Sequence, residues 1–195
     1  ETLITKAPGK YLAPRFSPDG KQIVYSKVRG GSLTTPWHGL ENGIYLAAAD
    51  GRNGDSGPLR LSKDGEAPQF GARSDAVYIT RSSISNEVDS LRKLVRIELS
   101  DRQETEVARS EFASEYAVSP DGQWLGFVER FHAYVTPLPL TGKAITVGPK
   151  MEGLPVRQLD VNAGEFMHWS GDSQRLHFAL ADELFTTPLA AAFAP

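Results

Sequence analysis

The chain has 195 residues, of which 40% are apolar, and its formal net charge is −3 at pH 7. This composition supports one domain of ordinary size with a buried core, while the interspersed charges provide neither a basic patch for nucleic acid nor a polybasic segment for a membrane surface. The lack of cysteine excludes disulfides, thiolate metal sites and a cysteine nucleophile, and no apolar run approaches the roughly 20 residues that span a bilayer.

A short phrase, made of an apolar residue, a turn and alternating apolar residues, recurs four times along the chain. The copies are 48 to 54 residues apart and begin at Pro14, Pro68, Tyr116 and Met167. The first and third copies contain Ser-Pro-Asp-Gly, in which proline presets the first central φ, aspartate tolerates the second and glycine supplies a positive φ. This chemistry predicts a hairpin between two antiparallel strands. It also explains Asp19 and Asp121 as turn residues, in preference to catalytic or metal-binding carboxylates.

Each copy carries further apolar runs that predict short strands. The residues after each turn alternate with period 2, as in a half-buried strand. A third run follows in every copy, beginning at Gly43, Lys93, His132 and Glu183. A fourth follows in three copies, beginning at Pro58, Glu104 and Ala144. The most helix-like window, 88–99, merges into one of these strands, so the chain is predicted to be all-β.

Four short antiparallel strands at this spacing are typical of the blades of a β-propeller. We predict a single β-propeller domain or fragment over 1–195 with four recognisable four-stranded blades. The repeats are expected at about 11–65, 66–111, 112–161 and 162–195. The fourth copy lacks an outer strand, and residues 1–6 supply an extra one. Either four blades form a closed ring that 2–6 completes, or the chain is part of a larger propeller.

The Ser-Pro-Asp-Gly phrase with its alternating apolar residues resembles the WD40-like repeat, or PD40 repeat, of TolB-like propellers. Two longer phrases, FASEYAVSPDGQWLGFVERFHAYVTPLPLTG at 112–142 and LPVRQLDVNAGEFMHWSGDSQRLHF at 154–178, resemble the propeller segment that precedes a metal-dependent amidohydrolase barrel in large bacterial proteins. The resemblance implies that this chain is the propeller part of such a protein, located in the periplasm or outside the cell. The family's His-x-His metal pair has no counterpart here, so the resemblance assigns no catalytic residue.

The sequence shows no pattern that predicts catalysis, a metal site or a cofactor. It contains no G-x-S-x-G nucleophile elbow, no G-x-G-x-x-G and no P-loop. Its four histidines have neither the i, i+4 spacing nor the His-x-His of a zinc site. His168 and His177 straddle one hairpin and could face each other, yet a lone strand histidine is more often structural than a ligand. We expect no cofactor in this chain and no enzyme activity of the chain alone.

The long connections predict where an interaction face would lie. In an antiparallel four-stranded blade, the second connection and the link to the next blade emerge at the same end. The three longest connections, 27–43, 81–92 and 149–165, all fall at that end. Because function collects on long loops presented by a rigid scaffold, we predict an interaction face there. Its candidate residues are Trp37, His38, Arg81, Arg92, Arg157 and Asp160.

Three functions remain open at this point. The first is a non-catalytic propeller module for scaffolding, protein interaction or active-site gating in a larger bacterial hydrolase of amidohydrolase type. Its partner would be the hydrolase domain of the same polypeptide or another protein. The second is the gating propeller of a prolyl-oligopeptidase-like serine peptidase. The third is a metal-dependent propeller lyase, which is favoured least because the four histidines are scattered over three copies.

Overall fold

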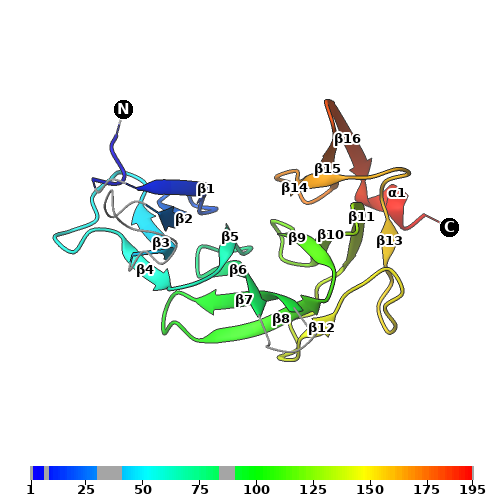
Figure 1. Cartoon of the computed structure of the whole chain (residues 1–195), viewed down its shortest axis with the longest axis horizontal. Helices are drawn as coiled ribbons and strands as arrows, with labels where there is room; N and C mark the ends of the chain where they lie inside the picture. The colour runs from blue at the N-terminus through cyan, green and yellow to red at the C-terminus, as the bar shows by residue number, and fades with distance from the viewer. Residues whose placement is uncertain (1, 7–8, 30–40, 84–90, 195) are drawn as a thin grey trace. The chain divides into compact units, whose positions relative to one another are not determined.

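The structure is a computed structural model, and it describes residues 2–6, 9–29, 41–83 and 91–194. These residues form strands and turns almost throughout (Figure 1). The strands are β1 (Lys10–Phe16), β2 (Gln22–Arg29), β3 (Gly43–Ala48), β4 (Leu59–Ser62), β5 (Glu66–Phe70), β6 (Ala76–Ser83), β7 (Leu91–Glu98), β8 (Glu104–Ser110), β9 (Ala113–Val118), β10 (Trp124–Glu129), β11 (His132–Pro137), β12 (Ile145–Thr146), β13 (Arg157–Gln158), β14 (Glu165–Trp169), β15 (Arg175–Leu180) and β16 (Glu183–Pro188). Among the described residues, no helix has the length and apolar character needed to cross a bilayer.

Each copy of the repeated phrase forms the predicted antiparallel hairpin. The turns join β1 to β2, β5 to β6, β9 to β10 and β14 to β15. All four hairpins share one register, in which the residue before the turn pairs with the residue seven positions later. The four pairs are Phe16 with Ile23, Phe70 with Val77, Val118 with Leu125 and Trp169 with Leu176. Three different turn sequences, one of which occurs twice, therefore produce the same strand alignment.

The chain divides into two compact units, Glu1–Arg81 with Val95–Glu104, and Ser82–Leu94 with Thr105–Pro195. In the first unit, a meander of order β1-β2-β3-β4 is followed by the strands β5 and β6. Alternate side chains of β2 to β7 form one apolar core, as the period-2 pattern predicts. The core residues are Val24, Ile44, Leu46, Leu61, Phe70, Val77, Ile79, Val95 and Ile97.

The second unit contains a four-stranded sheet of order β13-β11-β10-β9 and a three-stranded sheet of order β14-β15-β16. Its core consists of Ala117, Val128, Ala133, Val135, Met167, Leu176, Phe178 and Leu189. Close approach between its elements depends on glycine at two places. A side chain at Gly126 would meet Met167, and one at Gly164 would meet Phe178 and Ala133. Both positions are therefore restricted to glycine by packing.

A bulge recurs in the first strand of three sheets. Ala13, Ala67 and Phe166 have φ values of 49°, 47° and 56°, and the strand register shifts at each of them. All three residues directly precede the repeated phrase, so the bulge belongs to the repeat. Such bulges bend a strand and redirect its side chains. In the second unit, the bulge redirects a phenylalanine where the first unit has alanine.

The outer strand of the third copy lies in a different place from the one predicted. The sequence predicts it from Ala144, but β12 pairs in parallel with β8, and the outer partner of β11 is β13. The carbonyl of Ala133 faces the outer strand, where it accepts the N–H of Leu159. Backbone groups alternate along a strand, so those of Pro137, four residues later, face the same side. Proline has no N–H to donate there. The segment after Pro137 therefore cannot begin a regular outer pairing at once. It first joins the neighbouring sheet, where Val147 is buried.

Two smaller expectations are also corrected. Residues 2–6 form no strand; the side-chain amide of Asn53 instead donates to the carbonyl of Ile4, beside the β3–β4 connection. The third run of the last copy ends in the helical turn α1 (Leu189–Ala192), which begins directly after Pro188. Proline is compatible with the start of a helix and ends the β-ladder. The expected lack of a fourth strand in the last copy agrees with the described residues, in which β16 pairs with β15.

We predict that Gly164→Ala destabilises the chain and Gly171→Ala does not. A Cβ at Gly164 would lie 2.6 Å from Cδ2 of Phe178 and 3.1 Å from Cβ of Ala133, whereas one at Gly171 meets nothing within 4 Å. Overpacking of this kind costs about 1–3 kcal/mol, and an unhindered turn substitution changes stability by about 0.5 kcal/mol or less. Urea unfolding of both variants measures the difference. Equal stabilities would contradict the close packing at Gly164.

Candidate interaction face

The turn aspartates are held inside their own turns, as predicted from the sequence. The Ser17 hydroxyl donates to Oδ1 of Asp19 at 2.6 Å, and the backbone N–H of Lys21 donates to the same oxygen at 3.1 Å. Ser119 and Asp121 repeat this arrangement, with an oxygen–oxygen distance of 2.5 Å. The Ser17 hydroxyl, and then the Lys21 N–H, lower the pKa of Asp19. These carboxylates stabilise the turn, which confirms their interpretation as turn residues.

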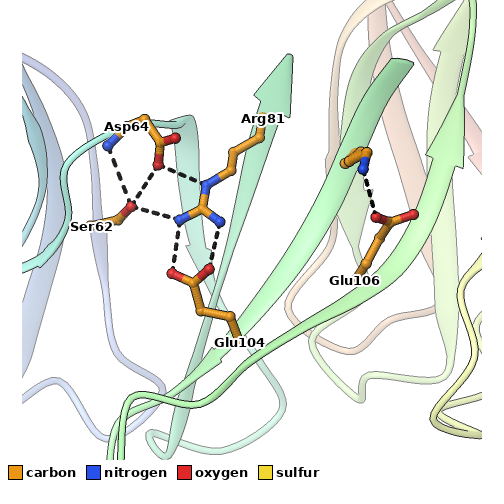
Figure 2. Close-up of polar contacts among 6 residues, drawn as sticks. Ser62, Asp64, Arg81, Glu104 and Glu106 are labelled. Atoms are coloured by element: carbon orange, nitrogen blue, oxygen red, sulfur yellow. Dashed lines mark hydrogen bonds and ion pairs between the residues drawn. The ribbon is translucent and has the colours of Figure 1, made fainter. Parts of the chain in front are cut away.

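Arg81 on β6 is the centre of a polar cluster in the first unit (Figure 2). Its guanidinium binds Glu104 with two contacts, of 2.5 and 2.8 Å. It also donates to Oγ of Ser62 at 2.8 Å, and its Nε lies 2.8 Å from Oδ1 of Asp64. The side chain is only 22% exposed, and the hydrogen bonds to Glu104 raise its pKa. Three hydrogen bonds and one ion pair of Arg81 thus connect the β4–β5 link to the first residue of β8.

Arg92, at the start of β7, connects two sheet ends of the second unit. Its Nη2 donates to the carbonyl of Ser114 at 3.0 Å, and its Nη1 lies 3.5 Å from Oγ of Ser82. In return, the Tyr116 hydroxyl donates to the carbonyl of Arg92 at 2.9 Å. Tyr116 is buried. Arg92 therefore aligns the start of β7 with the start of β9.

Asp160 pairs with His132 where β11 begins. Oδ2 of Asp160 lies 2.8 Å from Nδ1 of His132, and Oδ1 accepts the backbone N–H of Ala133 at 2.8 Å. The carboxylate is 2% exposed. Asp160 also lines a pocket of about 160 Å³ with Leu159, Phe178 and other neighbours, which is well below the roughly 300–1,000 Å³ of ordinary ligand pockets. The contacts of Asp160 favour a structural role in anchoring β11.

The remaining candidates of the predicted face have separate surroundings. Arg157 lies on the outer strand β13, where its Nη1 donates to the carbonyl of Val156 and its Cζ lies 5.5 Å from the ring centre of Phe193. Trp37 and His38 lie outside the described residues. Arg81, Arg92, Arg157 and Asp160 each have different partners. The three long connections belong to both units. That they share one face therefore stays a prediction.

Three of the phenylalanines of the second unit are more than half exposed, and we name them the phenylalanine rim: Phe112, Phe131 and Phe166. Their exposed fractions are 52%, 67% and 73%. They lie just before β9, in the β10–β11 turn and at the start of β14. The guanidinium carbon of Arg130 lies 4.3 Å from the ring centre of Phe112, which is a cation–π contact. Exposed aromatic side chains with an arginine beside them are typical of protein-binding surfaces.

Backbone contacts hold the phenylalanine rim at one end of the second unit. The N–H of Gly164 donates to the carbonyl of Phe131 at 2.7 Å. Two residues further on, the N–H of Phe166 donates to Oε1 of Glu115 at 2.9 Å. Glu115 is near the start of β9, next to which Phe112 lies. The three residues therefore occupy neighbouring strand ends on a hydrogen-bonded frame.

Sequence reasoning missed the phenylalanine rim, although one signal was present. Aligning the four copies places Phe166 opposite Ala13 and Ala67, directly before the repeated phrase. The alignment therefore shows a bulky residue in the last copy at a position where the first two copies have alanine. What the alignment does not contain is the positive φ, which points the phenylalanine away from the core.

Comparisons with known proteins identify the fold. No family model matches the chain, and no curated protein sequence matches it significantly. TolB from Acinetobacter baumannii superposes on 95% of this chain with a TM-score of 0.63 and 16% identity, over 42% of its own length. A TolB-type protein from Agrobacterium tumefaciens matches 97% of this chain and 80% of its own length, with a TM-score of 0.53 and 15% identity. The β-propeller domain of the Trilobed protease from Pyrococcus furiosus matches 94% of this chain and 58% of its own length, with a TM-score of 0.52 and 10% identity.

These similarities establish the fold class. The chain is an all-β β-propeller with four recognisable blades, as the repeat predicts, and its fold is similar to that of TolB. It spans less than half the length of the Acinetobacter TolB. At such low identities, the likeness concerns the fold alone.

We predict that Arg81→Ala lowers the free energy of unfolding by about 1–3 kcal/mol, because Glu104, Asp64 and Ser62 lose charged donors in a partly buried cluster. The matched control is Arg73→Ala. Arg73 and Asp75 are 3.8 Å apart and both mostly exposed, so this pair contributes about 0.5 kcal/mol or less. Urea unfolding compares the two variants. An equal effect would show that the Arg81 cluster does not connect the strands.

A second prediction concerns the carboxyl group of Asp19. Its pKa, followed by NMR, is expected below the ordinary value, and Ser17→Ala is expected to raise it. A lowered pKa in the folded state means that the ionised group stabilises the fold above its unfolded pKa, and that this contribution is lost as pH falls through the folded pKa. A pKa of Asp19 at or above its ordinary value, or no response to Ser17→Ala, would contradict the role of this turn.

Proposed function

We propose that this chain is a non-catalytic interaction module and that its phenylalanine rim is the binding surface. The observation that carries the proposal is Phe166. Its ring is 73% exposed, while its backbone has the positive φ that disfavours bulky residues. The fold thus gains little burial from this side chain and accepts strain to hold it. Strain at an exposed aromatic residue is better explained by binding than by stability.

The fold supports this role by giving the rim a rigid base. Arg92 and Tyr116 align β7 with β9, and Glu115 accepts two backbone N–H groups at the start of β14. A surface fixed in this way loses little conformational freedom on binding. The apolar rings and the charge of Arg130 suit an apolar segment that carries an acidic residue. Of the predicted face, we propose that Arg92 and Asp160 position this base and that Arg157 extends the surface, while Arg81, Trp37 and His38 stay candidates from the sequence alone.

The partner that we propose is the hydrolase domain of the same polypeptide, or a separate protein, and the hydrolase is of amidohydrolase type. The two long phrases at 112–142 and 154–178 support this choice. The alternative is a serine peptidase that the propeller gates, since one propeller of similar fold belongs to a protease. The gene around residues 1–195 distinguishes them: His-x-His after a strand supports the amidohydrolase, and G-x-S-x-G supports the peptidase.

The resemblance to TolB-like proteins leads us to propose a periplasmic or extracellular location. Fractionation of cells that produce the full-length protein tests this directly. Recovery in the periplasmic or culture fraction supports the proposal, and recovery with the cytoplasm contradicts it. The proposed interaction does not depend on the compartment.

We predict that Phe166→Ala keeps the stability of the chain within about 1 kcal/mol, and that Phe166→Gly raises it, because glycine accepts the positive φ. Ala13 and Ala67 occupy the same bulge in the first unit, so alanine is compatible with it. Urea unfolding measures both effects. A loss of more than about 2 kcal/mol in Phe166→Ala would place this ring in the core and remove the argument for binding.

Binding itself is tested in the full-length protein with a triple variant, Phe112→Ser with Phe131→Ser and Phe166→Ser. We expect association with the partner domain or protein to weaken at least about tenfold, since aromatic residues dominate interface energies. The control is Val161→Ser with Leu184→Ser, two apolar residues of the same unit that are similarly exposed, at 90% and 68%. Co-purification and sedimentation report association. Equal weakening in both variants would show that the rim has no specific role.

A further inference from the structure

Two histidines stack on one face of the three-stranded sheet in the second unit. His168 on β14 and His177 on β15 are direct partners in the antiparallel register. Their ring centres are 4.9 Å apart, with 26° between the ring planes. Directly paired residues of antiparallel strands project from the same face. The hairpin therefore holds both imidazoles side by side. The binding function proposed for the phenylalanine rim does not use them.

The hydrogen bonds of the two rings decide which nitrogen of each faces outward. Nδ1 of His168 lies 3.4 Å from the carbonyl oxygen of Phe166. A carbonyl only accepts, so Nδ1 carries the proton and Nε2 keeps its lone pair. Nδ1 of His177 lies 2.8 Å from the hydroxyl oxygen of Thr186 on β16. With this hydroxyl as acceptor, His177 has the same tautomer. Metal-binding histidines are oriented in this way, by a bond from the other ring nitrogen.

Both imidazoles are accessible from solvent. His168 is exposed and His177 partly so, which gives an ion access from solvent.

We propose that His168 and His177 form a two-histidine site for a divalent transition-metal ion, with water or a donor from a binding partner in the remaining positions. Imidazole nitrogens suit copper, nickel and zinc ions in particular. Two nitrogens that share one ion at about 2.0–2.1 Å are at most about 4 Å apart, and the two ring centres are 4.9 Å apart. Among the described residues, no group of three or more histidine, cysteine or acidic side chains is arranged for a metal ion. The two imidazoles therefore leave other coordination positions of the ion open. These positions are available to water or to a donor from a binding partner.

The test is titration of the untagged chain with copper(II) and, separately, zinc, followed by calorimetry. We expect one ion per chain, bound more tightly for copper than for zinc, as the general order of affinities predicts. His168→Ala and His177→Ala are each expected to weaken binding at least about tenfold, and the double variant to abolish it. His38→Ala is the control histidine and is expected to bind as the original chain does. Circular dichroism shows whether each variant keeps its strands.

NMR provides a second readout that does not depend on the variants. Zinc is expected to shift the ring resonances of His168 and His177 first, and Thr186→Val is expected to weaken binding without removing either imidazole. Binding that persists in the double variant, or zinc shifts confined to His38 and His132, would overturn the proposal. So would the lack of saturable binding up to about 1 mM ion. Because the phenylalanine rim is not altered in these experiments, failure of this site leaves the proposed binding function standing.

Discussion

The shared register of the four hairpins is the constraint on which the rest of the structure depends. In each copy, the residue before the turn pairs with the residue seven positions later. Side chains alternate along a strand, so a slip of one residue would turn the apolar set of a sheet toward solvent. Serine–aspartate contacts within the first, third and fourth turns hold this register. The buried cores of both units follow from it.

The same register determines where functional groups are presented. A bulge directly before the repeated phrase has alanine in the first two copies and Phe166 in the last. Because the hairpin after the bulge is fixed, the redirected residue points to solvent instead of shifting the sheet. The pairing of His168 with His177 lies within that same hairpin. One repeat thus supplies both an exposed aromatic residue and a histidine pair, and neither requires a change in the scaffold.

The sequence was sufficient for the hairpins, because turn chemistry and period-2 alternation are local. It was insufficient for the outer strand of the third copy. The run from Ala144 could pair with either of two sheets, and it pairs with β8, while β13 pairs with β11. The missing N–H of Pro137 accounts for this choice. The Arg81 cluster was also out of reach, since its partners Ser62 and Glu104 come from distant strands. Phe166 could be found from the repeat alignment, but its exposure depends on a backbone angle that the alignment does not show.

Site-specific photocrosslinking in cells that produce the full-length protein tests the central claim most directly. A photoreactive phenylalanine analogue would replace Phe131 or Phe166 in separate experiments, and Leu140, which is 53% exposed, would serve as the reference position. The account predicts a discrete crosslinked product from positions 131 and 166 and none from 140. Crosslinking of equal strength from all three positions, or from 140 alone, would contradict a binding surface at the phenylalanine rim.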